Sequence, residues 1–232
     1  MRRILFAAAL VAASPVAAQE HEGHGSRTLS ATWIEADVAR GGGETILNWD
    51  AEGWIGGDRD KFWWKSEGEI AGGETEQAEV QALYSRAVWT FVDAQAGVRQ
   101  DLEPAGTTWV AAGVQGLLPY LLETELHGFV STRGDVQLRA KQSFDLLLTN
   151  RLIVEPLAEI EIELADSARR GVRSGFSRVE TGAHLRYEIE RGFAPYVTAV
   201  YERRLAGTAR LVRAAGEDVG GWRVGGGIRL AF

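Results

Sequence analysis

The chain has 232 residues, of which 25 are lysine or arginine and 32 are aspartate or glutamate, so its formal net charge is −7. It contains no cysteine, which excludes disulfide bridges and thiolate metal sites. The acidic balance argues against a nucleic-acid partner and is compatible with a partner that is a cation.

Residues 1–18 have the pattern of a secretory signal peptide. A basic start at Arg2 and Arg3 precedes an apolar segment, residues 4–13, and small residues lead to an expected cleavage after Ala18. The remaining chain has 23 basic and 32 acidic residues, a net charge of −9. It has no apolar run near the roughly 18 residues that a membrane helix needs. Any membrane crossing must therefore be made by strands.

Residues 19–27 are expected to form a flexible tether, which begins QEHEGHGS. His21 and His24 lie three residues apart in it, beside Glu20 and Glu22. Neutral imidazoles and carboxylates are ligands for Cu(II) or Zn(II), so one interpretation is a weak metal site. The alternative is an exposed leader that only keeps the chain soluble.

Residues 28–232 predict an all-β, antiparallel domain of about twelve strands. Each expected strand alternates between apolar and polar residues, or is rich in aromatic residues, and is bounded by turn residues. Many exceed the roughly nine to eleven residues that a tilted strand needs to cross a bilayer. The expected strands are residues 28–40, 44–55, 60–71, 75–89, 90–103, 107–119, 120–132, 136–150, 151–166, 177–192, 193–205 and 222–232.

The segment AEIEIELAD, residues 158–166, shows the alternation most clearly. As a strand it directs three carboxylates to one side and three aliphatic side chains to the other. This suits a half-buried strand of a soluble protein, and it equally suits a membrane barrel with the reverse polarity. In the barrel, lipid would contact Ile160, Ile162 and Leu164, and a polar lumen would receive Glu159, Glu161 and Glu163.

The connections between the strands favour the barrel. The longest connections, near residues 167–175 and 206–221, follow odd-numbered strands, whereas those after even-numbered strands are very tight. Bacterial outer-membrane barrels have short periplasmic turns and longer outer loops. We therefore predict a transmembrane β-barrel in the outer membrane, with the tether on the periplasmic side, rather than a secreted soluble sandwich.

The last strand points the same way. Its alternate residues are Trp222, Val224, Gly226, Ile228, Leu230 and Phe232. An apolar face closed by a terminal aromatic residue looks like the signal that outer-membrane assembly machinery reads, so this machinery is an expected partner. Six tryptophans near strand ends would suit interfacial girdles; they are Trp33, Trp54, Trp63, Trp89, Trp109 and Trp222.

Inward-facing charges supply the candidate site. The candidate metal ligands in the barrel are Glu123, Glu125, His127, Glu159, Glu161, Glu163 and His184. The simpler interpretation is a lumen filled by ion pairs, in which the carboxylates are compensated by Arg99, Arg139, Lys141 and Arg186. The alternative is a cation-binding interior in which His127 and His184 ligate Cu(II) or a similar ion.

Two further functions have weaker support in the sequence. A barrel hydrolase could use His127 or His184 as a general base, but no spacing assembles a nucleophile, a base and an orienting group, so we expect no enzyme. Lipopolysaccharide phosphates could be contacted by arginines around an outer loop, although a solvated loop is the commoner explanation. These arginines are Arg169, Arg170, Arg173 and Arg178.

Several segments, in the right order along the chain, resemble the copper-resistance protein B (CopB) family of Gram-negative outer membranes. They are DKFWWKSEGE, QALYSRAVW, DAQAGVRQDL, GVQGLLPYLLETE, FDLLLTNRLIVEP, LRYEIERGFAPYV and GGGIRLAF. The similarity runs from Trp49 to Phe232. It implies an outer-membrane barrel that contributes to copper resistance by binding or sequestering copper at the cell envelope.

The sequence departs from the family at its N-terminal end. Family members commonly carry a Met- and His-rich region ahead of the barrel, whereas here the only methionine is Met1. Thioether and thiolate sulfur favour Cu(I), so we expect the mature chain to prefer Cu(II). The alternative function is a small porin or structural barrel with an ion-paired lumen and incidental metal affinity.

Overall fold

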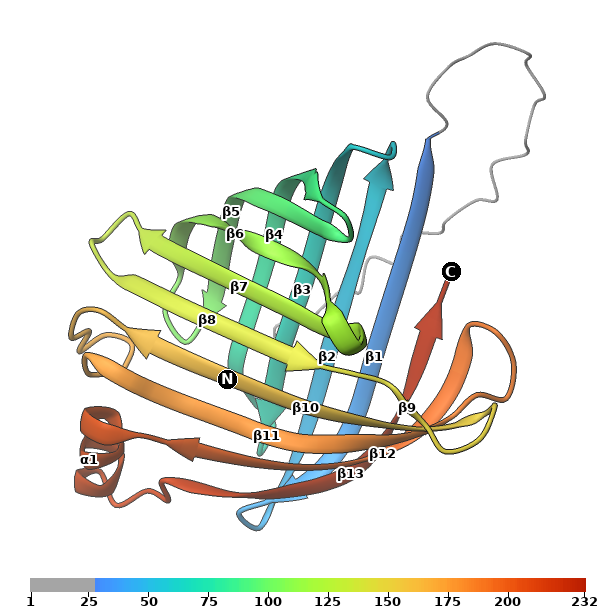
Figure 1. Ribbon diagram of the computed structural model, residues 1–232. Coiled ribbons are helices and arrows are strands. Elements are labelled where there is room, and N and C mark those ends of the chain that lie inside the picture. Colours follow the sequence, from blue (N-terminus) through green and yellow to red (C-terminus); the bar gives the residue numbers. More distant parts are fainter. Residues whose placement is uncertain (1–27) are drawn as a thin grey trace, which may run out of the picture.

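Residues 28–232, the part that the computed structural model describes, form one closed antiparallel β-barrel (Figure 1). The barrel closes because β1 pairs with β13 as well as with β2. The strands are β1 (Leu29–Gly41), β2 (Glu44–Gly56), β3 (Asp60–Ala71), β4 (Glu74–Trp89), β5 (Val92–Glu103), β6 (Thr107–Leu118), β7 (Leu122–Ser131), β8 (Val136–Ser143), β9 (Leu146–Leu147), β10 (Leu152–Glu163), β11 (Gly175–Tyr187), β12 (Phe193–Arg204) and β13 (Gly220–Ala231).

The two-residue β9 is a continuation of β8. Both segments pair with β10 in one register, Ser143 opposite Leu157 and Leu146 opposite Val154. The strand is interrupted only at residues 144–145. The barrel therefore has twelve strands, which confirms the number and the antiparallel arrangement predicted from the sequence.

The two rims of the barrel differ in their connections. The turn rim carries residues 57–59, 90–91, 119–121, 148–151 and 188–192, the third of which is a 3-10 turn, η1 (Pro119–Leu121). The loop rim carries residues 42–43, 72–73, 104–106, 132–135, 164–174 and 205–219. The start of β1 and the end of β13 both lie at the turn rim. Because the short turns of such barrels face the periplasm, the loop rim is assigned to the cell exterior.

The longest loop contains a helix that the alternation pattern did not predict. The sequence predicts a long connection near residues 206–221, and α1 (Ala206–Ala214) occupies most of it, at the rim where β12 ends (Figure 1). Its residues are mainly strong helix formers, and Gly216 adopts the left-handed conformation (φ 85°) that commonly ends a helix. Within residues 28–232, no helix has the length and apolar character of a membrane span.

The outer wall of the barrel is apolar, as predicted. Glu161 and Glu163 are buried in the interior, whereas Leu164 on the other parity is exposed and Ile160 and Ile162 are half-buried. The opposite polarity of a soluble sandwich is therefore excluded. Large apolar side chains exposed on other strands include Val38, Ile55, Val98, Val110, Val130, Val197 and Val224.

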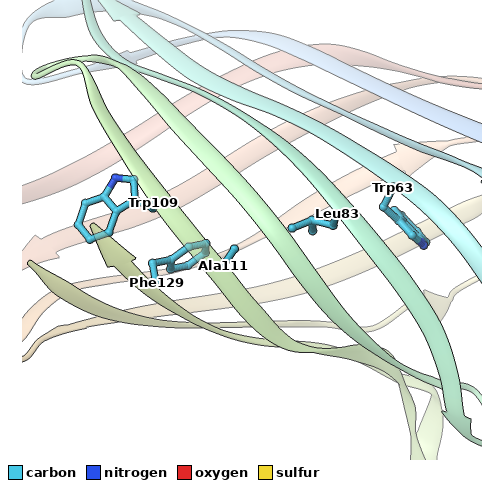
Figure 2. Close-up of a cluster of buried hydrophobic side chains, with 5 residues drawn as sticks. All are labelled: Trp63, Leu83, Trp109, Ala111 and Phe129. Carbon is cyan, nitrogen blue, oxygen red and sulfur yellow. The ribbon is translucent and has the colours of Figure 1, made fainter. Parts of the chain in front are cut away.

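The expected tryptophan girdle is only partly correct. Trp89 and Trp222 are exposed on the outside, but Trp63 and Trp109 are buried in the lumen, where they belong to a cluster with Leu83, Ala111 and Phe129 (Figure 2). Trp33 and Trp54 pack against the same cluster. A position near a strand end does not determine which face of the barrel wall a tryptophan occupies. Parity along the strand decides the face, since Trp63 alternates in phase with the inward Lys65.

Candidate functional site

The barrel lumen collects the charged residues that the alternation predicted to face inward. All candidate ligands within residues 28–232 point to this side: some are buried there and the others line its cavity. His21 and His24 lie outside the described residues. The lumen is therefore the candidate functional site, and its ion pairs determine which groups are free.

The glutamates of β10 are held by basic groups from neighbouring strands and a loop. Glu163 forms a two-pronged pair with Arg170, with nitrogen–oxygen distances of 2.7 and 2.8 Å. Glu161 lies between Arg139 (3.5 Å) and Arg178 (3.7 Å). Glu159 is flanked by the same two arginines and by Lys141, at 3.6–3.8 Å. The ladder of carboxylates in this segment is a compensated structure.

Arg139 is the centre of the compensated region. Its guanidinium group reaches across the lumen from β8 to β4 and donates two hydrogen bonds to Glu79, at 2.9 and 3.0 Å. Arg99 approaches Glu79 at 3.1 Å and Asp101 at 2.6 Å. These bonds join opposite walls. We call the six buried residues of this region the ion-pair plug; they are Glu79, Arg99, Asp101, Arg139, Glu161 and Glu163.

The candidates on β7 have different surroundings. The Glu125 carboxylate accepts a 2.6 Å hydrogen bond from Lys65. His127 is buried, with Nε2 2.9 Å from the Gln95 side-chain oxygen and Nδ1 3.9 Å from Glu125. Glu123 forms no ion pair within residues 28–232 and lines the cavity described next.

An open cavity of about 950 Å³ occupies much of the remaining lumen. It reaches Phe91 and Leu117 at the turn rim and extends along the continuous wall of β11, β12, β13, β1, β2 and β3. None of the six plug residues lines it. The lumen is thus divided into a filled, charge-compensated part and a part with accessible space.

A row of five carboxylates crosses the two parts. Neighbouring strands place them directly opposite one another in the order Glu35, Asp50, Glu67, Glu79 and Asp101. Like charges in such positions destabilise a sheet unless cations compensate them. Asp50 is the one member of this row that has no ion pair in the described residues, and its side chain is exposed within the cavity.

His184 faces the Glu35 end of this row. Its Nδ1 lies 3.8 Å from a Glu35 oxygen, and its ring stacks on Tyr196 with 4.8 Å between the ring centroids. The Tyr196 hydroxyl donates to Asp37 at 3.2 Å. We call these residues with the adjoining Asp50 the His184 cluster; it comprises Glu35, Asp37, Asp50, His184 and Tyr196.

The donor types in the His184 cluster suit Cu(II), since imidazole nitrogen and carboxylate oxygen are its common protein ligands. The ligands are not gathered around a point, however. Among residues 28–232, no three His, Asp or Glu side chains are arranged to hold a metal ion. Glu35 also lies 3.2 Å from Arg229. A cation in this cluster would require side chains to rotate toward it.

Sequence reasoning missed part of this site. Glu35, Asp37 and Asp50 were not among the candidate ligands, although Glu35 and Asp37 alternate in phase on β1. That same-parity pair was the available signal. Two arginines considered for outer-surface contacts, Arg170 and Arg178, instead pair with interior carboxylates. Arg170 lies in the loop between β10 and β11, and its position in the sequence does not indicate that its side chain pairs with Glu163 inside the barrel.

Comparison with solved structures identifies the fold. The KdgM porin matches with a TM-score of 0.56, covering 86% of this chain and 99% of its own, at 12% sequence identity. The NanC porin matches with a TM-score of 0.58, covering 85% and 98%, at 9% identity. Identities this low support the barrel architecture alone.

Comparison of sequences is more specific. "Copper resistance protein B" of Escherichia coli is 46% identical over 172 residues, which cover 74% of this chain and 58% of that protein. "Copper resistance protein B homolog" of Pseudomonas syringae pv. tomato is 44% identical over 189 residues, covering 81% and 64%. The chain thus matches about three fifths of the length of these curated relatives.

The family model described as "Copper resistance protein B precursor (CopB)" matches residues 28–232, the whole of the described barrel. A closed antiparallel barrel with an apolar outer wall is the architecture of outer-membrane proteins, and the relatives agree with this location. The chain is an outer-membrane β-barrel that belongs to the copper resistance protein B family.

Proposed function

We propose that this barrel contributes to copper resistance by binding Cu(II) at the cell envelope, and that the His184 cluster is its site within the barrel. The observation that carries the proposal is that two carboxylates of the cluster, Asp37 and Asp50, have no ion pair within residues 28–232 and line the same open cavity as His184. Family membership supplies copper as the cation. We expect no catalytic activity.

The ion pairs explain why the other candidate ligands are weaker. Glu159, Glu161 and Glu163 already contact arginine or lysine, and Glu125 contacts Lys65. A copper ion would have to displace these cations and leave them unpaired in the lumen, which costs free energy. Asp50 and Glu123 have no such partner among the described residues, so they attract a cation without that cost.

Copper stoichiometry is the direct test. Calorimetry with elemental analysis would measure Cu(II) bound by the detergent-refolded mature protein, by a form lacking residues 19–25, and by H184A/D50N. The matched control is H127A/E123Q, which also removes one imidazole and one unpaired carboxylate. We expect H184A/D50N to lose the copper held by the barrel and the control to retain it.

Other results would relocate the site. Copper lost only on deletion of residues 19–25 would assign it to His21 and His24. Loss only in H127A/E123Q would assign it to β7. A competition with a Cu(I) chelator tests the expected preference for Cu(II), because a tighter affinity for Cu(I) would contradict it.

A second function is favoured by the ion-pair plug, which fills part of a porin-like barrel. In this case the protein is a small porin or structural barrel whose metal affinity is incidental. Single-channel conductance separates the two functions. A steady open pore without stoichiometric copper supports the porin, whereas copper bound in a closed lumen supports the copper-binding barrel.

The predicted interaction with the assembly machinery remains a proposal for Phe232. This residue is exposed on the outer face, and its backbone forms two hydrogen bonds with Thr32, at 3.2 and 3.0 Å. It therefore completes the seam between the last and first strands. Slower barrel assembly in cells carrying Phe232→Ala, with an unchanged final fold, would support a role in recognition.

A further inference from the structure

The outer wall of β12 changes character step by step toward the loop rim. Its outward residues, in order, are the exposed Val197, then Ala199, Tyr201 and the exposed Arg203. Tyr201 packs against Trp222 of β13, with 5.4 Å between the ring centroids. The order apolar, aromatic, basic matches the passage from hydrocarbon through the interface to charged headgroups. Arg203 therefore lies at headgroup level.

The helix in the following loop adds two more arginines at this rim. α1 is anchored by the buried Gly207, Thr208 and Ala209, and the Thr208 hydroxyl accepts a 3.0 Å hydrogen bond from the backbone of the loop between β10 and β11. Arg210 and Arg213 lie on its exposed side. The helix itself lies at the rim beside β11 and β12 (Figure 1), so both arginines belong to this rim.

The arginines near α1, in the loop between β10 and β11, at the end of β12 and in α1 itself, fall into two groups. Those with a carboxylate partner are Arg169, Arg170, Arg173 and Arg204, at 3.6, 2.7, 2.6 and 3.2 Å. No acidic partner within residues 28–232 is found for Arg203, Arg210 or Arg213. The exposed acids that follow α1, Glu217 and Asp218, form no ion pair with them either. The second group is available to an external anion.

We propose that Arg203, Arg210 and Arg213 form a binding site for the phosphate groups of lipid A, the membrane anchor of lipopolysaccharide. Guanidinium groups bind phosphate oxygens bidentately, and the aromatic pair below them contacts the adjoining sugar and acyl region. The loop rim faces the outer leaflet, where this phosphorylated glycolipid is located. The site lies at the loop rim, outside the lumen carboxylates, and does not depend on copper.

Native mass spectrometry of the detergent-refolded protein, titrated with diphosphorylated lipid A, tests the proposal. We expect R203Q/R210Q/R213Q to bind roughly tenfold or more weakly, because each basic residue near an anionic lipid surface contributes measurably to affinity. Lipid A from which both phosphates have been removed should bind wild type about as weakly. The matched control is R59Q/R151Q/R191Q, which removes three exposed arginines of the turn rim and should bind like wild type.

Each alternative result contradicts the proposal. Unchanged binding by the first triple variant excludes these arginines. An equal loss in both triple variants shows attraction by net charge alone. If phosphatidylglycerol binds as tightly as lipid A with the same arginine dependence, the ligand is a phospholipid headgroup. Heat-modifiable gel mobility verifies that each variant is folded. If a triple variant does not fold, the three corresponding single variants replace it, and each single variant of the proposed site is expected to weaken binding.

Discussion

The ion-pair plug and the His184 cluster use the same chemical groups with opposite results. In the plug, carboxylates such as Glu79 and Glu163 each contact an arginine and are sealed from the cavity. In the cluster, Asp50 continues the same cross-strand row of acids but has no cationic partner among the described residues. Whether a carboxylate in the lumen binds a cation or serves the structure therefore depends on whether an arginine or lysine side chain from another strand or loop pairs with it.

Removal of the central arginine should have the largest effect. Arg139→Met leaves Glu79 buried without its two-pronged partner and weakens the surroundings of Glu161. Breaking one side of a buried ion pair typically costs about 3–5 kcal/mol of unfolding free energy. Urea unfolding of the refolded barrel measures the loss.

Two controls interpret that result. Arg86→Met alters an exposed pair with Asp60 at 3.8 Å and should change the unfolding free energy by about 0.5 kcal/mol or less. Glu79→Gln introduced into Arg139→Met should recover part of the stability, because it removes a buried charge that has lost its two-pronged partner and keeps only the ionic contact with Arg99. If Arg139→Met and Arg86→Met lose similar stability, the plug does not stabilise the barrel as described.

Removal of the cation nearest to two carboxylates of the cavity should have an intermediate effect. Lys141 lies 2.6 Å from Glu67 and 3.6 Å from Glu159, and all three line the cavity. Lys141→Met removes the cation and leaves both carboxylates facing the space beside Asp50. We expect Cu(II) affinity to rise roughly tenfold, since a charge at about 4 Å contributes on the order of 1–4 kcal/mol.

Arg86→Met is again the control for this experiment, because it changes the net charge equally but lies outside the lumen. Calorimetric titration with Cu(II) compares the three proteins. A similar gain in both variants would show that net charge, rather than lumen geometry, governs copper affinity.

The smallest expected effect concerns Asp135, in the loop-rim turn. Burial alone would raise its pKa, but hydrogen bonds from Ser167 and Ser131 and the nearby Arg170 and Arg169 hold the pKa below its usual value of 3.8. The ionised group therefore adds stability above pH 3.8, and this stability is lost as the pH falls through the lower pKa of the folded protein.

Asp135→Asn should remove this acid-range dependence at a cost of about 1 kcal/mol or less near neutral pH. Urea unfolding between pH 2 and pH 6, a range of about two units on either side of the ordinary pKa, provides the comparison with wild type. An unchanged pH dependence in Asp135→Asn would show that other carboxylates dominate acid unfolding.

Much of the fold could be predicted because strand alternation is a local property. The polarity of residues 158–166, the twelve strands and the closing apolar face of β13 all depend on a period of two residues along the chain. Parity also explains the errors, since tryptophans assigned by strand position alone were placed on the wrong face. α1 was missed because a helix in a loop leaves no trace in a strand pattern.

The sequence by itself thus determined which side of the barrel wall each residue faces, because neighbouring residues define that pattern. Only the tertiary structure decided which inward carboxylates are neutralised. Arg139 and Glu79 are 60 positions apart, and Lys141 and Glu67 are 74 apart, so their pairing depends on which strands face each other across the closed lumen. Closure of the barrel places strands that are far apart in the sequence opposite each other, and the local alternation pattern does not indicate which strands these are.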